Sequence, residues 1–67
     1  MKIGDLARAT GISVRTLHYY EELGLVRPAR RSSQGHRLYG ERELLRLQQI
    51  LSLRALGLRL TEIAGLL

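Results

Sequence analysis

The residues of this chain best suited to bind a ligand are basic side chains that have no acidic neighbours. Four arginines fall between Arg27 and Arg37, and no Asp or Glu lies among them. The whole chain has 11 Lys and Arg against 6 Asp and Glu, a formal net charge of +5, and all but one of these cations are arginine. A solvated basic loop would explain the cluster, but a polyanionic partner such as nucleic acid explains it better.

Catalytic and metal chemistry have less support. His18 and His36 are the only histidines and cysteine is absent, so no metal site is expected. Glu21 and Glu22 are neighbours on a predicted helix, where their side chains point about 100° apart, so they are expected to be solvated or to pair locally with Arg. The sequence contains no nucleophile–base pair or phosphate loop. We therefore predict a protein that is not an enzyme and needs no cofactor.

The length and composition allow one small globular domain. A chain of 67 residues buries only about 60% of the surface that its unfolded form exposes. Hydrophobic residues make up 45% of the sequence, which is typical of a folded chain. No apolar run approaches the roughly 20 residues of a membrane span, and no signal-peptide pattern is present. A cytoplasmic protein without a membrane partner is expected.

Two short helices are predicted at the start of the chain. The first covers about residues 4–9, with Gly4 as N-cap, and ends at Gly11. Ser13 is suited to cap the second, at residues 14–23. A connection of three or four residues that contains glycine has the spacing of a helix-turn-helix.

The second helix has one inward and one outward face at about 100° per residue. Leu17 and Tyr20 fall on the inward face. The outward face carries Arg15, His18, Tyr19 and Glu22. A recognition helix reads DNA bases with residues near its N-terminal end, which makes Arg15 the natural contact.

An irregular segment and two more helices follow. Pro28 and the Ser32–Gly35 turn interrupt the helical period. Residues 26–27 and 36–39 are predicted to pair as a short hairpin, or wing. Helices are predicted at residues 41–56 and 60–67.

The third predicted helix is rich in leucine. Leu44, Leu47, Ile50 and Leu51 form a stripe that is expected to face the core. Other faces carry Leu45, Leu53 and Leu56. One small domain does not need so much apolar surface, so part of it is expected to meet a partner chain or a missing segment. Because the chain stops on two leucines, it is expected to be cut from a longer one.

The sequence resembles the N-terminal DNA-binding domain of MerR-family transcription regulators over nearly its whole length. The matching segments include Ile3-Gly4-Asp5-Leu6-Ala7, Gly11-Ile12-Ser13, Thr16-Leu17-His18-Tyr19-Tyr20-Glu21, Gly24-Leu25-Val26, Gly35-His36-Arg37-Leu38-Tyr39 and Leu56-Gly57-Leu58. The resemblance implies a mainly α winged helix-turn-helix of four helices and a two-stranded β-hairpin. Its parts would be the helix-turn-helix at 3–24, the wing at 25–39 and a second helix pair at 41–67, without the dimerisation helix and sensor region of the bacterial family.

The resemblance also implies partners and roles. Family members bind pseudo-palindromic promoters as dimers and distort the DNA so that RNA polymerase can use it. Arg15 would contact a base, Arg37 a phosphate, and Arg54 would belong to the second wing. The predicted DNA-binding residues are Ser13, Val14, Arg15, Thr16, His18, Tyr19, Tyr20, Arg30, Arg31, His36, Arg37, Tyr39 and Arg54.

Two histidines depart from the family pattern. His18 stands where Arg is common, and His36 stands where the wing usually has Tyr. Two alternatives remain beside the promoter-binding reading. One is an excisionase-like, architectural DNA-bending module, and the other is a protein-interaction domain that uses the third and fourth helices.

Overall fold

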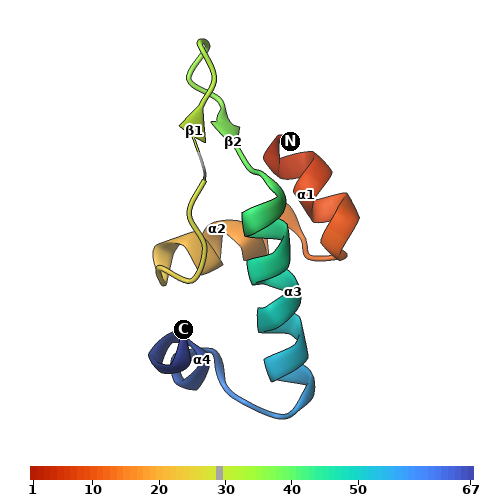
Figure 1. Cartoon of the computed structure of the whole chain (residues 1–67), viewed down its shortest axis with the longest axis vertical. Coiled ribbons are helices and arrows are strands. Elements are labelled where there is room, and N and C mark those ends of the chain that lie inside the picture. Colours follow the sequence, from red (N-terminus) through yellow and green to blue (C-terminus); the bar gives the residue numbers. More distant parts are fainter. Residues whose placement is uncertain (29) are drawn as a thin grey trace.

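Four helices and one β-hairpin make up the fold. The computed structural model describes residues 1–28 and 30–67. Its elements are α1 (Ile3–Thr10), α2 (Val14–Glu22), β1 (Arg30–Arg31), β2 (Arg37–Leu38), α3 (Glu41–Ala55) and α4 (Leu60–Leu66) (Figure 1). The predicted winged helix-turn-helix is confirmed. Among the described residues, no helix combines the length and apolarity needed to cross a membrane.

The helix-turn-helix forms much as its capping residues predict. The Ser13 hydroxyl accepts a hydrogen bond from the Thr16 amide at 3.1 Å, which caps α2. Gly11 ends α1 with a φ of 74°, a conformation that costs glycine little. The predicted cap of α1 at Gly4 is wrong. The cap is Lys2, because the Asp5 carboxylate accepts from the Lys2 amide at 3.2 Å and so starts the helix earlier.

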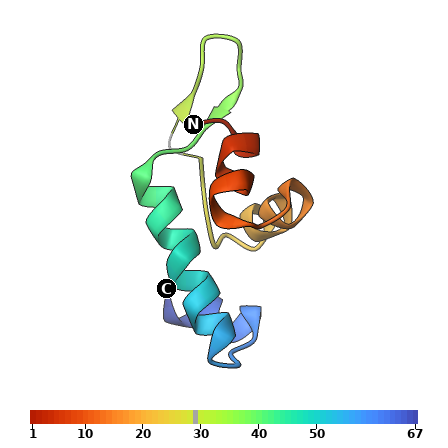
Figure 2. The ribbon, with the colours of Figure 1, turned by 90° about the vertical axis from the view of Figure 1, so that its right-hand side faces the viewer.

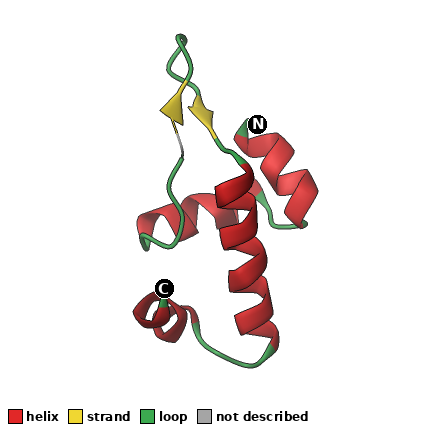
Figure 3. Ribbon diagram, in the orientation of Figure 1, coloured by secondary structure: helices red, strands yellow, loops and turns green. Residues whose placement is uncertain are grey.

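The wing is a two-stranded antiparallel hairpin (Figure 3), but its first strand is not where the sequence predicted it. Arg30 pairs with Leu38 and Arg31 pairs with Arg37. The predicted strand at residues 26–27 is wrong because Val26 is buried in the core. Ala29, within the predicted wing, lies outside the described residues.

The N-terminal residues anchor the base of the wing. Lys2 forms an antiparallel bridge with Leu38, and the Tyr39 amide donates to the Met1 carbonyl at 2.7 Å. The start of α1 is therefore fixed beside β2. Figure 2, turned by 90° from Figure 1, shows the hairpin leaving from this end of the molecule while α4 lies at the other end of α3.

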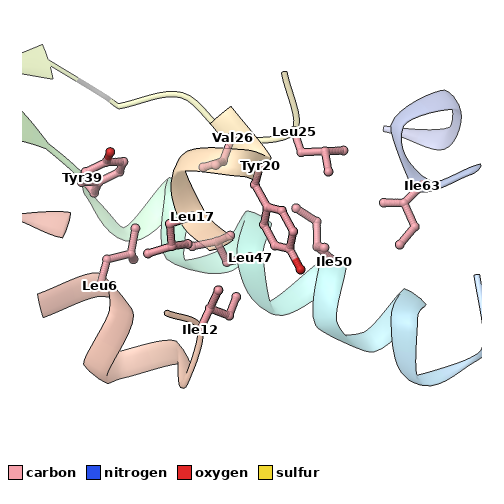
Figure 4. Close-up of a cluster of buried hydrophobic side chains, with 10 residues drawn as sticks. All are labelled: Leu6, Ile12, Leu17, Tyr20, Leu25, Val26, Tyr39, Leu47, Ile50 and Ile63. Carbon is pink, nitrogen blue, oxygen red and sulfur yellow. The ribbon is translucent and has the colours of Figure 1, made fainter. Parts of the chain in front are cut away.

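A single hydrophobic core joins the helices (Figure 4). Its buried members are Leu6, Ile12, Leu17, Tyr20, Leu25, Val26, Tyr39, Leu47, Ile50 and Ile63. From the predicted stripe of α3, Leu47 and Ile50 are fully buried and Leu44 packs against the core. Leu51 was expected to face inward, but it is 36% exposed because it lies one position beyond the buried face.

Candidate nucleic-acid interface

The outward face of α2 is open to solvent. Arg15, His18 and Tyr19 are exposed, as is Val14 in the first turn, whereas Leu17 and Tyr20 on the opposite face are buried. The predicted division of the helix into two faces is confirmed. Since Leu17 and Tyr20 pack α2 against the core, the exposed side chains extend from a helix whose position is fixed.

Ser13 and Thr16 hold the start of α2. The Ser13 hydroxyl donates to the Thr16 hydroxyl at 2.9 Å and also accepts from the Thr16 amide. Both residues are predicted DNA contacts, and in the free domain their hydroxyls are hydrogen-bonded to each other. These bonds stabilise the first turn of α2, which carries Arg15.

The wing presents cations at its strands and tip. Arg30, Arg31 and His36 are all exposed. The Arg31 guanidinium donates to the Gly35 carbonyl at 3.2 Å, which ties it across the turn. The turn itself closes through the Ser32 amide, which donates to the His36 carbonyl at 2.7 Å.

Arg37 connects the wing to α2. Its Nη1 donates to the Glu21 carboxylate at 2.6 Å and lies 3.4 Å from Nδ1 of His18. The Arg37 side chain is still 39% exposed. Because both contacts use Nη1, the rest of the five-donor guanidinium fork is available to a ligand on the exposed side.

Glu21 is the site residue that the sequence did not reveal. Its side chain is only 12% exposed and accepts hydrogen bonds from both Arg37 and the Tyr39 hydroxyl. Burial, together with the neighbouring Glu21 carboxylate, raises the pKa of Tyr39 to about 12. Both partners lie more than fifteen positions along the chain, so no helical spacing could have predicted them.

Two predicted DNA contacts are core residues. Tyr20 is 1% exposed and Tyr39 is 2% exposed, so neither ring is offered to a ligand in the free domain. The DNA contact of Tyr39 stays a prediction, and in the free domain its hydroxyl turns inward and donates to Glu21. The DNA contact of Tyr20 also stays a prediction, and in the free domain its hydroxyl accepts from Arg54 at 3.3 Å.

Two arginines of α3 reach toward the helix-turn-helix. Arg54 is exposed and is joined to Tyr20. Arg46 is half-buried, and its Nε donates to the Leu25 carbonyl at 3.0 Å. The second contact, absent from the sequence prediction, fixes the segment that leads from α2 to the wing. Among the described residues, no group of His, Cys, Asp or Glu is arranged to hold a metal ion.

A family model described as "MerR HTH family regulatory protein" matches residues 1–67. The chain belongs to the MerR family. The family predicted from the sequence motifs is thereby confirmed.

Curated MerR-type relatives match almost the whole chain. It is 51% identical over 65 residues to the HTH-type transcriptional activator TipA of Streptomyces coelicolor, covering 97% of this chain and 26% of TipA. It is 48% identical over 67 residues to the HTH-type transcriptional regulator ZntR homolog of Haemophilus influenzae, covering 100% of this chain and 50% of that protein. The chain thus spans between about a quarter and a half of these relatives.

Solved structures of MerR proteins have the same fold. The N-terminus of the Bacillus subtilis multidrug transporter activator, MtaN, superimposes with a TM-score of 0.93 at 40% identity, covering 97% of this chain and 61% of that one. A MerR-family transcriptional regulator from Bacillus cereus superimposes with a TM-score of 0.93 at 38% identity, and the match covers 98% of this chain and 49% of that one. The chain is a helix-turn-helix DNA-binding domain of a MerR-type transcription regulator, and these relatives are regulators rather than enzymes.

Proposed function

We propose that this domain binds double-stranded promoter DNA in a sequence-specific manner, with α2 in the major groove. Arg15, near the start of the exposed face, contacts a base edge, and the arginines of the wing contact phosphates of the flanking backbone. One observation carries the proposal. The Arg37 guanidinium lies beside His18, so the cationic wing borders the same exposed face of α2 that would enter the groove.

The charges of this face divide into two roles. Arg30, Arg31 and Arg37 of the wing, with Arg54 of α3, are proposed to neutralise phosphates, which orients the domain without reading sequence. If each domain neutralises about four phosphates, the log–log salt slope of binding is expected near −3 to −4. Arg15 has the fork geometry that reads guanine in the major groove, and such a contact discriminates by about 1–3 kcal/mol.

The longer protein is proposed to act as a homodimer in the cytoplasm. Two linked domains on a pseudo-palindromic promoter gain avidity that a single domain lacks. By family resemblance, RNA polymerase would use the promoter after the bound dimer distorts it. The length of the relatives supports a further region for dimerisation and sensing, since TipA is almost four times as long as the matched segment.

Fluorescence anisotropy tests the proposal. This chain is titrated with the duplex from upstream of its own gene and with a random duplex, at two salt concentrations. Preference for the upstream duplex with steep salt dependence supports the proposal. Salt-dependent binding without preference would favour the architectural module instead. Absence of binding at low salt would contradict DNA binding and favour protein interaction through exposed leucines such as Leu45 and Leu56.

A further inference from the structure

His18 of α2 and Arg37 of β2 are in contact, although they stand 19 positions apart in the chain. Nη1 of Arg37 lies 3.4 Å from Nδ1 of the His18 ring. A guanidinium has hydrogen-bond donors but no acceptor, and it stays charged at any ordinary pH. The contact is therefore a hydrogen bond only when Nδ1 carries no proton and accepts from Arg37.

The carboxylates on this side of α2 leave Nδ1 to Arg37. Both oxygens of Glu21 are engaged, since one accepts from Arg37 at 2.6 Å and the other accepts from the Tyr39 hydroxyl. Glu22 lines a hollow of about 420 Å³ together with His18, but its side chain is exposed. Within the described part of the chain, Arg37 is the hydrogen-bond partner of the His18 ring.

The contact decides which ring nitrogen carries the proton. A neutral imidazole has one N–H donor, and its other nitrogen is an acceptor. Because Nδ1 accepts from Arg37, the proton of the neutral ring is on Nε2, across the ring from the contact. No described residue pairs with Nε2, and His18 is exposed on the same face of α2 as Arg15 and Tyr19. The ring thus has one N–H donor to offer to a ligand of this face.

From this arrangement we infer that Arg37 is a positioning residue for His18, because it fixes the neutral ring in the tautomer whose Nε2–H donates to a phosphate oxygen of the DNA. The inference rests on the proposed function, since DNA must lie against α2 and the wing. A phosphate is the expected acceptor because Arg37, which touches the ring, is itself proposed to anchor the backbone. An arginine at position 18 has no acceptor and could not be held in this way.

NMR spectroscopy of the free domain tests the tautomer. Long-range ¹H–¹⁵N spectra of the ring nitrogens are recorded at about pH 8, above the range in which histidines ordinarily become charged. His18 is expected to be wholly in the Nε2–H form. His36, whose ring has no hydrogen bond to a described residue, serves as the internal reference and is expected to be a mixture of both tautomers.

Two arginine variants show whether Arg37 fixes this tautomer. In Arg37→Met, the spectrum of His18 is expected to change to the mixture that His36 gives. Arg31→Met is the matched variant, because it removes a cation of the same wing that bonds to the Gly35 carbonyl instead of to His18. It should leave the His18 spectrum unchanged. A mixture of tautomers in the parent chain, or an unchanged His18 spectrum in Arg37→Met, would overturn the inference.

His18→Gln and His18→Asn separate the roles of the two ring nitrogens. The amide of glutamine reaches the position of Nε2 and can donate to a phosphate. The amide of asparagine reaches only the position of Nδ1, where it can accept from Arg37. At about pH 8, His18→Gln should bind both duplexes within about twofold of the parent, whereas His18→Asn should weaken both alike by about three- to tenfold. Equal affinities of the two variants, or a loss confined to the upstream duplex, would contradict the inference.

The salt slope distinguishes a neutral donor from a cation. A neutral ring displaces no counterion, so His18→Asn should leave the log–log slope of binding unchanged at about pH 8. A slope shallower by about 1 would show that His18 binds as a cation, which would overturn the inference.

The parent chain separates the two possible failures. If the parent binds both duplexes with a steep salt slope and His18→Asn binds as well as His18→Gln, the proposed function stands and the inference fails. If the parent does not bind at low salt, both fail.

Discussion

Glu21 on α2 and Arg37 on β2 form an ion pair with an N–O distance of 2.6 Å that fixes the wing against the recognition helix. The same carboxylate accepts a hydrogen bond from the Tyr39 hydroxyl. Because the pair is mostly shielded on the Glu21 side, solvent screens it less than it screens an exposed pair. The Glu21 carboxylate therefore joins α2 both to the wing strand β2 and to the tyrosine that follows it.

Removal of Glu21 should destabilise the domain more than removal of Arg37. Glu21→Ala leaves the buried Tyr39 hydroxyl without its acceptor and is expected to cost about 2 kcal/mol, whereas Arg37→Ala is expected to cost about 1 kcal/mol. Urea unfolding of the two single variants and the double variant gives the coupling energy, expected at about 0.5 kcal/mol or more. Strictly additive losses would show that the ion pair does not hold the wing.

The domain should lose stability at high pH through Tyr39. The pKa of Tyr39 is raised from 10.0 to about 12 in the folded state, so the folded chain holds this proton more tightly than the unfolded chain does. The stability that the protonated Tyr39 hydroxyl contributes to the folded state is fully present below pH 10 and is lost as the pH rises toward 12. This pH-dependent stabilisation amounts to roughly 3 kcal/mol.

Tyr39→Phe is the matched variant for that pH dependence. It removes the titrating hydroxyl but keeps the ring in the core. Unfolding free energies measured from pH 9 to pH 11.5 should fall less steeply for the variant than for the parent chain. Equal slopes would indicate that Tyr39 does not carry the alkaline loss.

Arg46 should matter for folding more than its neighbour Arg42. Arg46→Ala removes the bond to the Leu25 carbonyl and is expected to cost about 1 kcal/mol. Arg42 is exposed one turn earlier on α3, and Arg42→Ala should change stability by less than about 0.5 kcal/mol. The comparison is made by urea unfolding, and equal effects would contradict the proposed role of Arg46.

Two leucines of α3 should respond differently to truncation. Leu47 is fully buried, and Leu47→Ala is expected to cost about 2–5 kcal/mol, which is comparable to the whole stability of so small a domain. Leu45 is 57% exposed, and Leu45→Ala should cost less than about 0.5 kcal/mol. Thermal unfolding followed by circular dichroism measures both. A large loss for Leu45→Ala would mean that another chain covers it in solution.

Local signals in the sequence predicted much of the fold. The division of α2 into two faces follows from helical spacing. The Ser13 cap follows from the preference for serine at the N-cap, where its hydroxyl accepts a hydrogen bond from an amide of the first turn. The position of β1 could not be predicted from local signals. A strand of two residues is too short to show alternation, and Val26 looks as suitable for a strand as for the core.

The missed contacts of the site depend on tertiary structure. Tyr20 meets Arg54 across 34 positions, and Arg46 meets Leu25 across 21. Composition indicates that such arginines favour anions, but it does not show which of them are already engaged within the protein. Glu21 was missed for the same reason, because its partners come from the wing.

Arg15→Ala and Arg37→Ala, measured side by side, test the division between base reading and phosphate anchoring most directly. The affinity of each variant for the upstream duplex and for a random duplex is determined at several salt concentrations. Arg15→Ala should lower the preference for the upstream duplex by about 1–3 kcal/mol and leave binding to random DNA nearly unchanged. Arg37→Ala should weaken binding to both duplexes alike and make the salt slope shallower by about 1. Equal losses on both duplexes for Arg15→Ala would contradict base reading by α2, and an unchanged salt slope for Arg37→Ala would contradict the wing as a phosphate anchor.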